Sequence, residues 1–123
     1  MAKLARQTAV EALLQINEDG GSSNVVFHNL VTRNELSAQD TALCSVLVYG
    51  ALERRLTLDH IIGAYSKTPV RKLTPAVREI LRISLYQLLY LEHIPDSAAV
   101  NEAVKLTRLM KVASASGFVN GVL

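Results

Sequence analysis

The sequence has no tryptophan and one cysteine among its 123 residues, and aromatic residues make up only 5% of it. The single cysteine, Cys44, excludes an internal disulfide, and one cysteine with three scattered histidines gives no zinc-binding pattern. Half of the residues are nonetheless hydrophobic. A core with so few rings must be built mainly from Leu, Val, Ile and Ala, which favours packed helices.

Long hydrophobic runs are also missing. No stretch approaches the roughly 20 apolar residues of a membrane-spanning helix, and the first ten residues lack the apolar core of a secretory signal. A charged fraction of 20% beside so many aliphatic residues excludes a disordered tail. We therefore expect a cytoplasmic protein of about one domain with no membrane partner.

The motifs of several enzyme classes are absent. The sequence has no glycine-rich phosphate or dinucleotide loop, no Gly-x-Ser-x-Gly elbow and no His-Glu-x-x-His motif. His28 and His93 lie on separate segments, and the neighbours Asp59 and His60 point about 100° apart on a helix. Cys44 lies among aliphatic residues, which is typical of a small buried hydrophobe. We expect no catalytic residue, no cofactor site and no metal site in these residues.

Prolines and glycines are few, three and six respectively, and they fall where helices should start or stop. Gly20 follows the first helix, Ser37 with Asp40 has the pattern of an N-cap, and Thr74-Pro75 is a start signal. The apolar spacing predicts helices over residues 2–17, around 25–31, 38–55, 57–65, 75–91, 96–110 and 113–123, with Thr57 capping the fourth and Asp96 or Ser97 the sixth.

Two of the predicted helices, 38–55 and 75–91, have almost no polar face. A helix with so little polar surface is usually central, so we expect these two to be the most buried, each at the centre of a small bundle. No segment alternates β-branched and polar residues as a strand does. The prediction is an all-α fold in two halves.

The last residues, 117–123, form an apolar helical segment with no charged side chain and no cap after it. A helix ending there would leave carbonyl groups unsatisfied and apolar side chains at a free terminus. Two interpretations remain: Val122 and Leu123 dock on the core, or the natural polypeptide continues. We expect the second.

Positive charge is concentrated between residues 54 and 82. This segment holds seven basic and two acidic residues, a balance of +5, whereas the whole chain carries +2. Five of the seven are arginines, and Arg78 and Arg82 lie four residues apart on one helix face. Because arginine forks onto phosphate and stacks on bases, such a cluster is typical of a nucleic-acid-binding surface.

The alternative interpretation is structural and stays open: some of these arginines pair with carboxylates and fix the two halves together. The pairs concerned are Arg54, Arg55 and Arg82 with Glu53, Asp59, Glu79 or Glu102. A second, smaller basic pair lies on the first helix. The candidate nucleic-acid-binding residues are therefore Arg54, Arg55, Arg71, Lys72, Arg78, Arg82, Lys3 and Arg6.

Several segments carry a family resemblance in a fixed order along the chain. They are RQTA at 6–9, QDTA at 39–42, LVYG at 47–50, LRISLYQLLY at 81–90, IP at 94–95, AVNEAV at 99–104 and GFVNGVL at 117–123. On these segments, which extend over essentially the whole chain, the sequence resembles the NusB family. The resemblance implies an all-α fold of about seven helices in two three-helix halves.

The family has two branches: stand-alone transcription antitermination factors, and the NusB-like N-terminal domain of small-subunit rRNA cytosine-C5 methyltransferases. The segments at 49–55, 86–90 and 94–102 look more like the methyltransferase branch. The antitermination branch more often has an acidic residue where Gln87 stands, and a first helix richer in arginine than Lys3 and Arg6 make it here. The resemblance thus implies that residues 1–123 are one NusB-like domain, the N-terminal part of a longer methyltransferase chain.

Three functional hypotheses follow. The favoured one is a non-catalytic domain that binds rRNA and docks on its own C-terminal catalytic domain; the parent enzyme would use S-adenosylmethionine. The second is an antitermination factor that binds leader RNA together with a ribosomal protein. The third is a structural module that packs on the catalytic domain and touches no RNA.

The missing motifs give a first prediction. A cytosine-C5 methyltransferase needs a cysteine nucleophile and a nest for S-adenosylmethionine, and neither is found in these residues. The 123-residue chain alone should therefore neither bind S-adenosylmethionine nor methylate rRNA. Calorimetric titration with the cofactor tests this, and saturable binding would contradict it.

Overall fold

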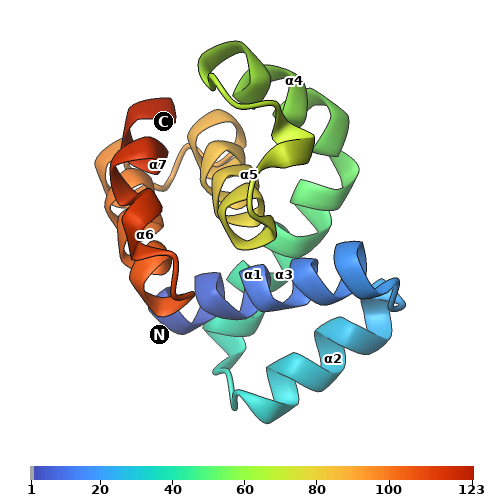
Figure 1. Ribbon diagram of the computed structural model, residues 1–123. Coiled ribbons are helices and arrows are strands. Elements are labelled where there is room, and N and C mark those ends of the chain that lie inside the picture. The colour runs from blue at the N-terminus through green and yellow to red at the C-terminus, as the bar shows by residue number, and fades with distance from the viewer. Residues whose placement is uncertain (1) are drawn as a thin grey trace.

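The computed structural model describes residues 2–123, with side chains from Leu4 onward. These residues form seven α-helices, two short 3-10 segments and no strand (Figure 1). The elements are α1 (Ala2–Asp19), α2 (Ser23–Arg33), α3 (Ala38–Glu53), α4 (Arg55–Tyr65), η1 (Val70–Lys72), α5 (Pro75–Tyr90), α6 (Asp96–Leu109), η2 (Ala113–Ala115) and α7 (Ser116–Val122). The predicted all-α fold of about seven helices is confirmed.

Three helix boundaries follow from local rules. The Ser37 hydroxyl accepts a hydrogen bond from the backbone N–H of Asp40 at 3.1 Å and so caps α3. Pro75 is the first residue of α5, where its missing N–H has no helical partner to lose. Gly20 follows α1 with φ of +74°, a conformation that glycine adopts without a steric penalty.

Other boundary predictions are wrong. Helix α4 begins at Arg55 rather than at Thr57, because Arg54 alone joins α3 to α4 with φ −100° and ψ 14°. No side chain caps α6: Pro95 occupies the cap position, and Asp96 is already the first helical residue. The predicted helix over 113–123 divides into η2 and α7.

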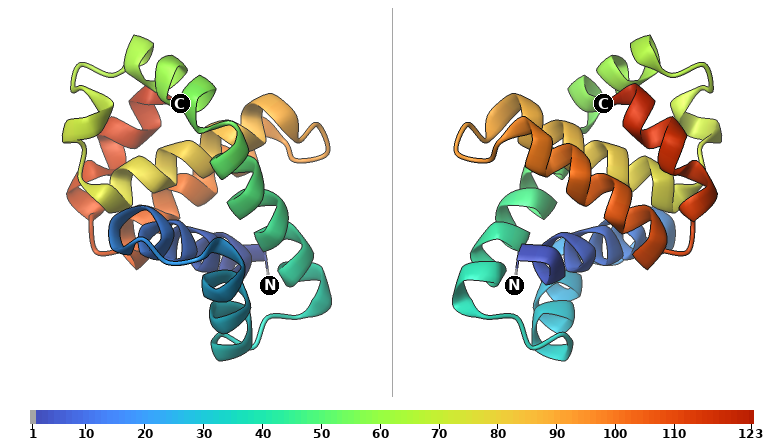
Figure 2. Two further views of the ribbon diagram at one scale, coloured as in Figure 1. Left: turned by 90° about the vertical axis from the view of Figure 1, so that its right-hand side faces the viewer. Right: turned by 90° about the vertical axis from the view of Figure 1, so that its left-hand side faces the viewer.

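Helix α1 connects the two halves of the molecule. It packs against α2 and α3 in the first half and against α5 and α6 in the second. Helix α5 is the centre of the second half, where it contacts α4 and α6 as well as α1 and α3. In the right-hand view of Figure 2, α6 crosses in front of α5 and α7 follows it.

The core is deepest around α5. Its residues Ile80, Leu81 and Ile83 are all fully buried, although they point to different sides of the helix. A helix can bury several sides only when neighbours surround it, as α1, α3, α4 and α6 surround α5. The prediction that the helix near 75–91 is central is confirmed.

The other predicted central helix is less buried than expected. On α3, Ala42 is exposed and Val46 is 42% exposed. Helix α1 is buried to a comparable extent, because its small residues Ala5, Ala9 and Ala12 let α3 and α5 approach closely. The pattern of apolar residues does not predict the burial of α1, because its buried positions include polar residues.

The crossing of α3 and α5 gives a second prediction. The ring of Tyr86 fills the space that a β-carbon on Gly50 would occupy. Replacing Gly50 by alanine should lower the free energy of unfolding by about 1–3 kcal/mol, because the half-buried Tyr86 ring must give up its packing against α3. Urea unfolding measures the change.

The matched control is Gly121→Ala in α7, where an added β-carbon meets nothing within 4 Å. Its free energy of unfolding should stay unchanged or rise by up to about 1 kcal/mol, since alanine is the better helix former. Equal effects of the two substitutions would contradict a close contact at Gly50.

Candidate nucleic-acid interface

Arg82 lies inside the molecule, 7% exposed, between two carboxylates. Its Nε and Nη2 donate to the two oxygens of Asp59, each at 2.8 Å, and its Nη1 donates to Glu79 Oε2 at 2.8 Å. Burial lowers the pKa of Arg82, but the bonds to Asp59 and the attraction of Glu79 outweigh it and raise that pKa above its ordinary value. Arg82 therefore joins α4 to α5 as a permanent cation, as the structural interpretation has it.

Glu79 is the deepest charged residue of the structure, with no exposed surface. Its Oε2 accepts hydrogen bonds from Arg82 and from Asn17 Nδ2 of α1, the latter at 3.1 Å, while its Oε1 has no hydrogen-bond partner. Burial raises the pKa of Glu79 above its ordinary value even though Arg82 lowers it. Burial of the Glu79–Arg82 ion pair costs desolvation free energy, so the pair is favourable only while its hydrogen-bond geometry is kept.

Arg78 is half-buried and is engaged in two directions. Its Nη2 lies 3.0 Å from Glu18 Oε2 near the end of α1, and its Nη1 donates to the carbonyl oxygens of Val70 and Arg71 at 3.3 and 3.4 Å. Arg78 and Arg82 do lie on the same helix, but both meet protein groups. Arg78 thereby fixes η1 against the start of α5.

Arg6 is buried as well, at 6% exposure. Its Nε donates to Gln87 Oε1 at 3.0 Å, and its Nη1 lies 3.8 Å from Glu102 Oε1. Burial lowers the pKa of Arg6, and the Glu102 charge counteracts this. Arg6 ties α1 to α5 and α6; the side chain of Lys3 lies outside the described residues.

Four of the predicted residues remain on the surface: Arg54, Arg55, Arg71 and Lys72. The guanidinium of Arg54 lies over the ring of Tyr90, 4.8 Å from its centroid. Within the described residues, none of the four takes part in an ion pair. Of the predicted residues whose side chains the structure describes, these four can meet an external phosphate without breaking an internal ion pair.

The structure also shows a basic surface that the sequence analysis missed. Lys105, Arg108 and Lys111 are all exposed at the C-terminal half of α6 and just beyond it. The sequence does carry a sign of it, because no aspartate or glutamate follows Glu102. Counting charge over residues 54–82 placed these three cations in the remainder of the chain, where acidic residues elsewhere masked them.

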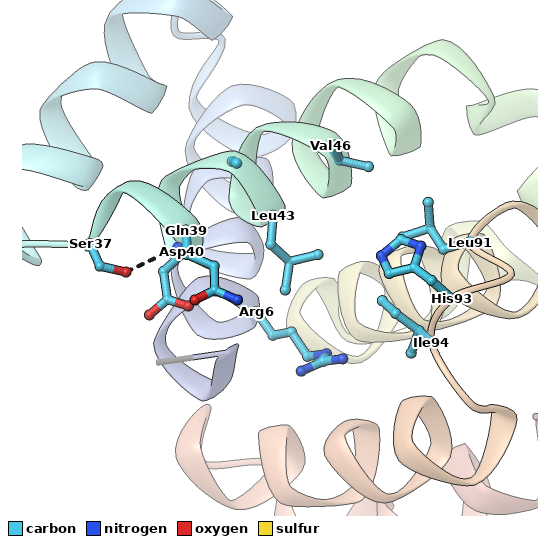
Figure 3. Close-up of a pocket in the computed structure, with 10 residues that line it drawn as sticks. Arg6, Ser37, Gln39, Asp40, Leu43, Val46, Leu91, His93 and Ile94 are labelled. Atoms are coloured by element: carbon cyan, nitrogen blue, oxygen red, sulfur yellow. Dashed lines mark hydrogen bonds between the residues drawn. The ribbon is translucent and has the colours of Figure 1, made fainter.

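A groove of about 730 Å³ lies between the start of α3 and the connection from α5 to α6 (Figure 3). Its walls are mostly apolar and include Leu43, Val46 and Ile94, and the Arg6 guanidinium points between Leu43 and Ile94. Arg6 already binds Gln87 and lies beside Glu102, so its guanidinium serves internal contacts at the edge of this groove.

The remaining chemistry-bearing groups are few. Cys44 is fully buried, and burial raises the pKa of its thiol to about 12, with the charge of Glu11 adding to this. A thiol in this state is a packing group and not a nucleophile. The described residues include no cluster of His, Cys, Asp or Glu that could hold a metal ion. None of their helices combines the length and apolar character that a membrane span requires.

The fold and its charges define a class: an all-helical domain of two halves, joined by buried arginine–carboxylate contacts, with a second set of basic side chains on its surface. The NusB family model matches residues 3–123, and the chain belongs to the NusB family. The family resemblance of the sequence is thus confirmed.

Two of the similar proteins are larger enzymes. The chain is 40% identical over 118 residues to the probable ribosomal RNA small subunit methyltransferase B of Bacillus subtilis, covering 96% of this chain and 26% of that protein. It is 38% identical to the protein of the same description from Synechocystis, covering 97% and 27%. The chain therefore spans about a quarter of the length of these relatives.

Other similar proteins match along most of their length. The transcription antitermination protein NusB of Symbiobacterium thermophilum is 32% identical, with 97% of this chain and 84% of that protein covered. Among solved structures, antitermination factors NusB and NusE in complex with dsRNA match with a TM-score of 0.88 at 24% identity, covering 98% of this chain and 90% of the other. A T. maritima NusB matches with a TM-score of 0.89 at 19% identity, covering 99% of this chain and 87% of the other. At these identities the solved structures show the shared fold.

The buried pair gives a third prediction. Replacing Arg82 by methionine should lower the free energy of unfolding at neutral pH by about 3–5 kcal/mol, because Glu79 is left as an uncompensated buried charge. Lower pH should lessen the loss. The pKa of Glu79 is higher in the folded than in the unfolded state, so protonated Glu79 favours the folded state. This stabilisation is complete below the unfolded-state pKa and is lost as the pH rises through the folded-state pKa.

The Arg82→Met variant should accordingly be less destabilised, relative to the unsubstituted chain, near pH 5 than near pH 8. Urea unfolding at both pH values measures the difference. In the double variant Glu79→Gln/Arg82→Met the greater loss near pH 8 should be absent, because the amide does not titrate. An equal loss at both pH values in the single variant would show that Glu79 is not the group responsible.

Proposed function

We propose that this chain is the NusB-like, non-catalytic RNA-binding domain of an rRNA cytosine-C5 methyltransferase, with residues 1–123 as the N-terminal domain of a longer protein. The observation that carries the proposal is the higher identity to the two methyltransferases, 40% and 38%, than to the antitermination protein, 32%. Coverage does not explain the difference in identity, because all three matches cover nearly the whole of this chain.

The RNA-binding part of the proposal rests on the exposed cations. Arg54, Arg55, Arg71 and Lys72 are accessible, and two of them share η1. Their neighbour Arg78 holds the carbonyl groups of η1 and so keeps Arg71 and Lys72 in place. A relative of the same fold was solved in complex with dsRNA, which is in keeping with this role. Arg6, Arg78 and Arg82 act as positioning residues in this proposal.

A domain of this kind assists catalysis by position. Its basic surface attracts rRNA over several ångströms, and the covalent tether converts the second encounter, between the RNA and the catalytic domain, into an intramolecular one. The cytosine chemistry and S-adenosylmethionine binding belong, in this proposal, to the C-terminal catalytic domain of the parent chain. The present residues supply affinity and orientation.

A second candidate is an antitermination factor. The chain matches 84% of the length of the Symbiobacterium protein, as expected if the natural protein were a NusB-like domain alone. The natural open reading frame separates the two: a frame several times longer than this chain supports the methyltransferase, and one of similar length supports the antitermination factor.

A third candidate is a domain that contacts its catalytic domain without touching RNA. Leu56, Tyr65 and Leu89 expose 82%, 72% and 46% of their surface. Tyr65 and Leu89 line an apolar groove of about 430 Å³ together with Leu123. Exposed apolar side chains gathered on α4 and α5 are typical of contacts between protein domains.

RNA binding is tested with the double variant Arg71→Gln/Lys72→Gln. If both side chains contact phosphates, the slope of log affinity against log salt concentration on single-stranded RNA should fall by about 0.7 for each lost contact. The melting temperature should stay unchanged, because neither side chain is part of an ion pair within the described residues.

The matched variant is Arg82→Gln, which should lower the melting temperature and leave the salt slope unchanged. Filter binding at several salt concentrations, beside thermal melts of each variant, provides both readouts. If the double variant keeps the salt slope of the unsubstituted chain, η1 is not part of the RNA-binding surface.

A further inference from the structure

A groove of about 520 Å³ lies between α6 and α7, the two helices that the right-hand view of Figure 2 turns to the viewer. We call it the α6–α7 groove. It is lined by Asn101, Val104, Lys105, Arg108, Ser116, Gly117 and Asn120. Every charged side chain among them is a cation, and the others offer two amides and a hydroxyl as hydrogen-bond donors.

Arg108 lines this groove and takes part in no ion pair within the described residues, and neither does Lys111, three residues further along the chain. The half-exposed Lys105 forms an ion pair with Glu102, with 3.2 Å between Nζ and Oε2, so Arg108 is the lining cation that can bind an external anion without breaking an internal contact. A β-carbon on Gly117 would meet nothing within 4 Å, so the backbone is open to close approach there. Arginine, lysine, asparagine and serine are the side chains that contact phosphate and sugar in nucleic-acid complexes.

Lys111 occupies a position that favours a different residue. The N–H of Lys111 donates to the carbonyl of Arg108 at 3.1 Å, and the N–H of Val112 donates to that of Thr107 at 2.7 Å, the bond pattern of a Schellman helix end. Lys111 has φ of +61° at the site where glycine is preferred. Lys111 lies along the chain between the lining residues Arg108 and Ser116, so a lysine there adds an exposed cation to this end of α6 although its backbone conformation favours glycine.

The groove also lies close to Lys72, one of the two exposed cations of η1. Lys72 shares a shallow depression with Ala115 and Phe118, and the next residues of that same turn, Ser116 and Gly117, line the α6–α7 groove. The first turn of α7 is therefore flanked by Lys72 on one side and by Arg108 on the other. One strand crossing this turn would meet both.

We propose that the α6–α7 groove binds the sugar–phosphate backbone of single-stranded RNA, on a track that continues across the first turn of α7 to Lys72. This inference rests on the proposed RNA-binding function and assigns it a second surface. Recognition there is by charge and by hydrogen bonds to phosphate and ribose, so it carries little sequence preference.

The end of α2 provides a structural twin for the test. Arg33 lies in the last turn of α2 as Arg108 lies in the last turn of α6. Glu35 has φ of +53° in the same pattern of bonds, from its own N–H to Thr32 and from the N–H of Leu36 to Val31. Glu35 therefore occupies the position of Lys111, and Arg33, which directly precedes its C-cap residue, lies one residue closer to the cap than Arg108 does.

The variants are Arg108→Gln and Lys111→Gly, with Arg33→Gln and Glu35→Gly as controls, in the 123-residue chain. Affinity for a short labelled single-stranded RNA of mixed sequence is measured from about 50 to about 200 mM salt, together with melting temperatures. Arg108→Gln and Lys111→Gly should each lower the salt slope by about 0.7. The controls should not lower it.

Lys111→Gly is the decisive variant, because glycine relieves the positive φ: it should melt at a higher temperature than the unsubstituted chain and yet bind RNA more weakly. Glu35→Gly should also melt higher, without weaker binding. If the unsubstituted chain binds RNA and both α6 variants keep its slope, the groove proposal is wrong and RNA binding stands. If the unsubstituted chain shows no salt-dependent RNA binding, the proposed function itself is wrong.

Discussion

The burial of one carboxylate governs how the second half of this domain meets the first. Glu79 has no contact with solvent, so it requires a cation and hydrogen-bond donors at fixed positions. Arg82 supplies the cation and also bonds to Asp59 of α4, while Asn17 of α1 donates a hydrogen bond to Glu79. Three helices therefore share one set of directional bonds. An apolar contact of equal area would allow them to slide, whereas a bidentate arginine does not.

Arg6 repeats this arrangement near the other end of α1, where it bonds to Gln87 of α5 and lies beside Glu102 of α6. Helix α1 is consequently fixed at two points, about three turns apart, against the same partner helix. The arrangement divides the basic residues into two populations. Those buried along α1 and α5 hold the fold, and those on η1, the α3–α4 junction and the end of α6 face solvent. A count of net charge merges the two.

This division explains what the sequence could and could not predict. Ser37 and Pro75 mark helix starts correctly, because capping depends on residues within one turn. Burial of α5 also follows from its own pattern. The fate of Arg82 does not, because spacing places it on the same helix face as Arg78 without saying whether that face meets solvent or Asp59.

The burial of α1 could not be predicted from the sequence for the same reason. Its inner face carries Arg6 and Thr8 among alanines, a mixture that resembles a surface helix until the partners 81 and 26 residues further along the chain are known. The cations of α6 escaped for another reason. The sequence shows that no acidic residue follows Glu102, but only the structure shows that Lys105 and Arg108 line one groove with α7.

The position of α1 has a consequence for synthesis on the ribosome. As the chain emerges, α1 can pair early with α2 and α3, but Asn17 waits 62 residues for Glu79 and Arg6 waits 81 residues for Gln87. Until α5 has left the exit tunnel, the second apolar side of α1 has nothing to cover it. The nascent first half is therefore an incomplete core, and cooperative folding is deferred to the arrival of α5 and α6. A pause in translation before that point would leave an aggregation-prone intermediate with exposed apolar surface, whereas a pause after it would leave a folded domain.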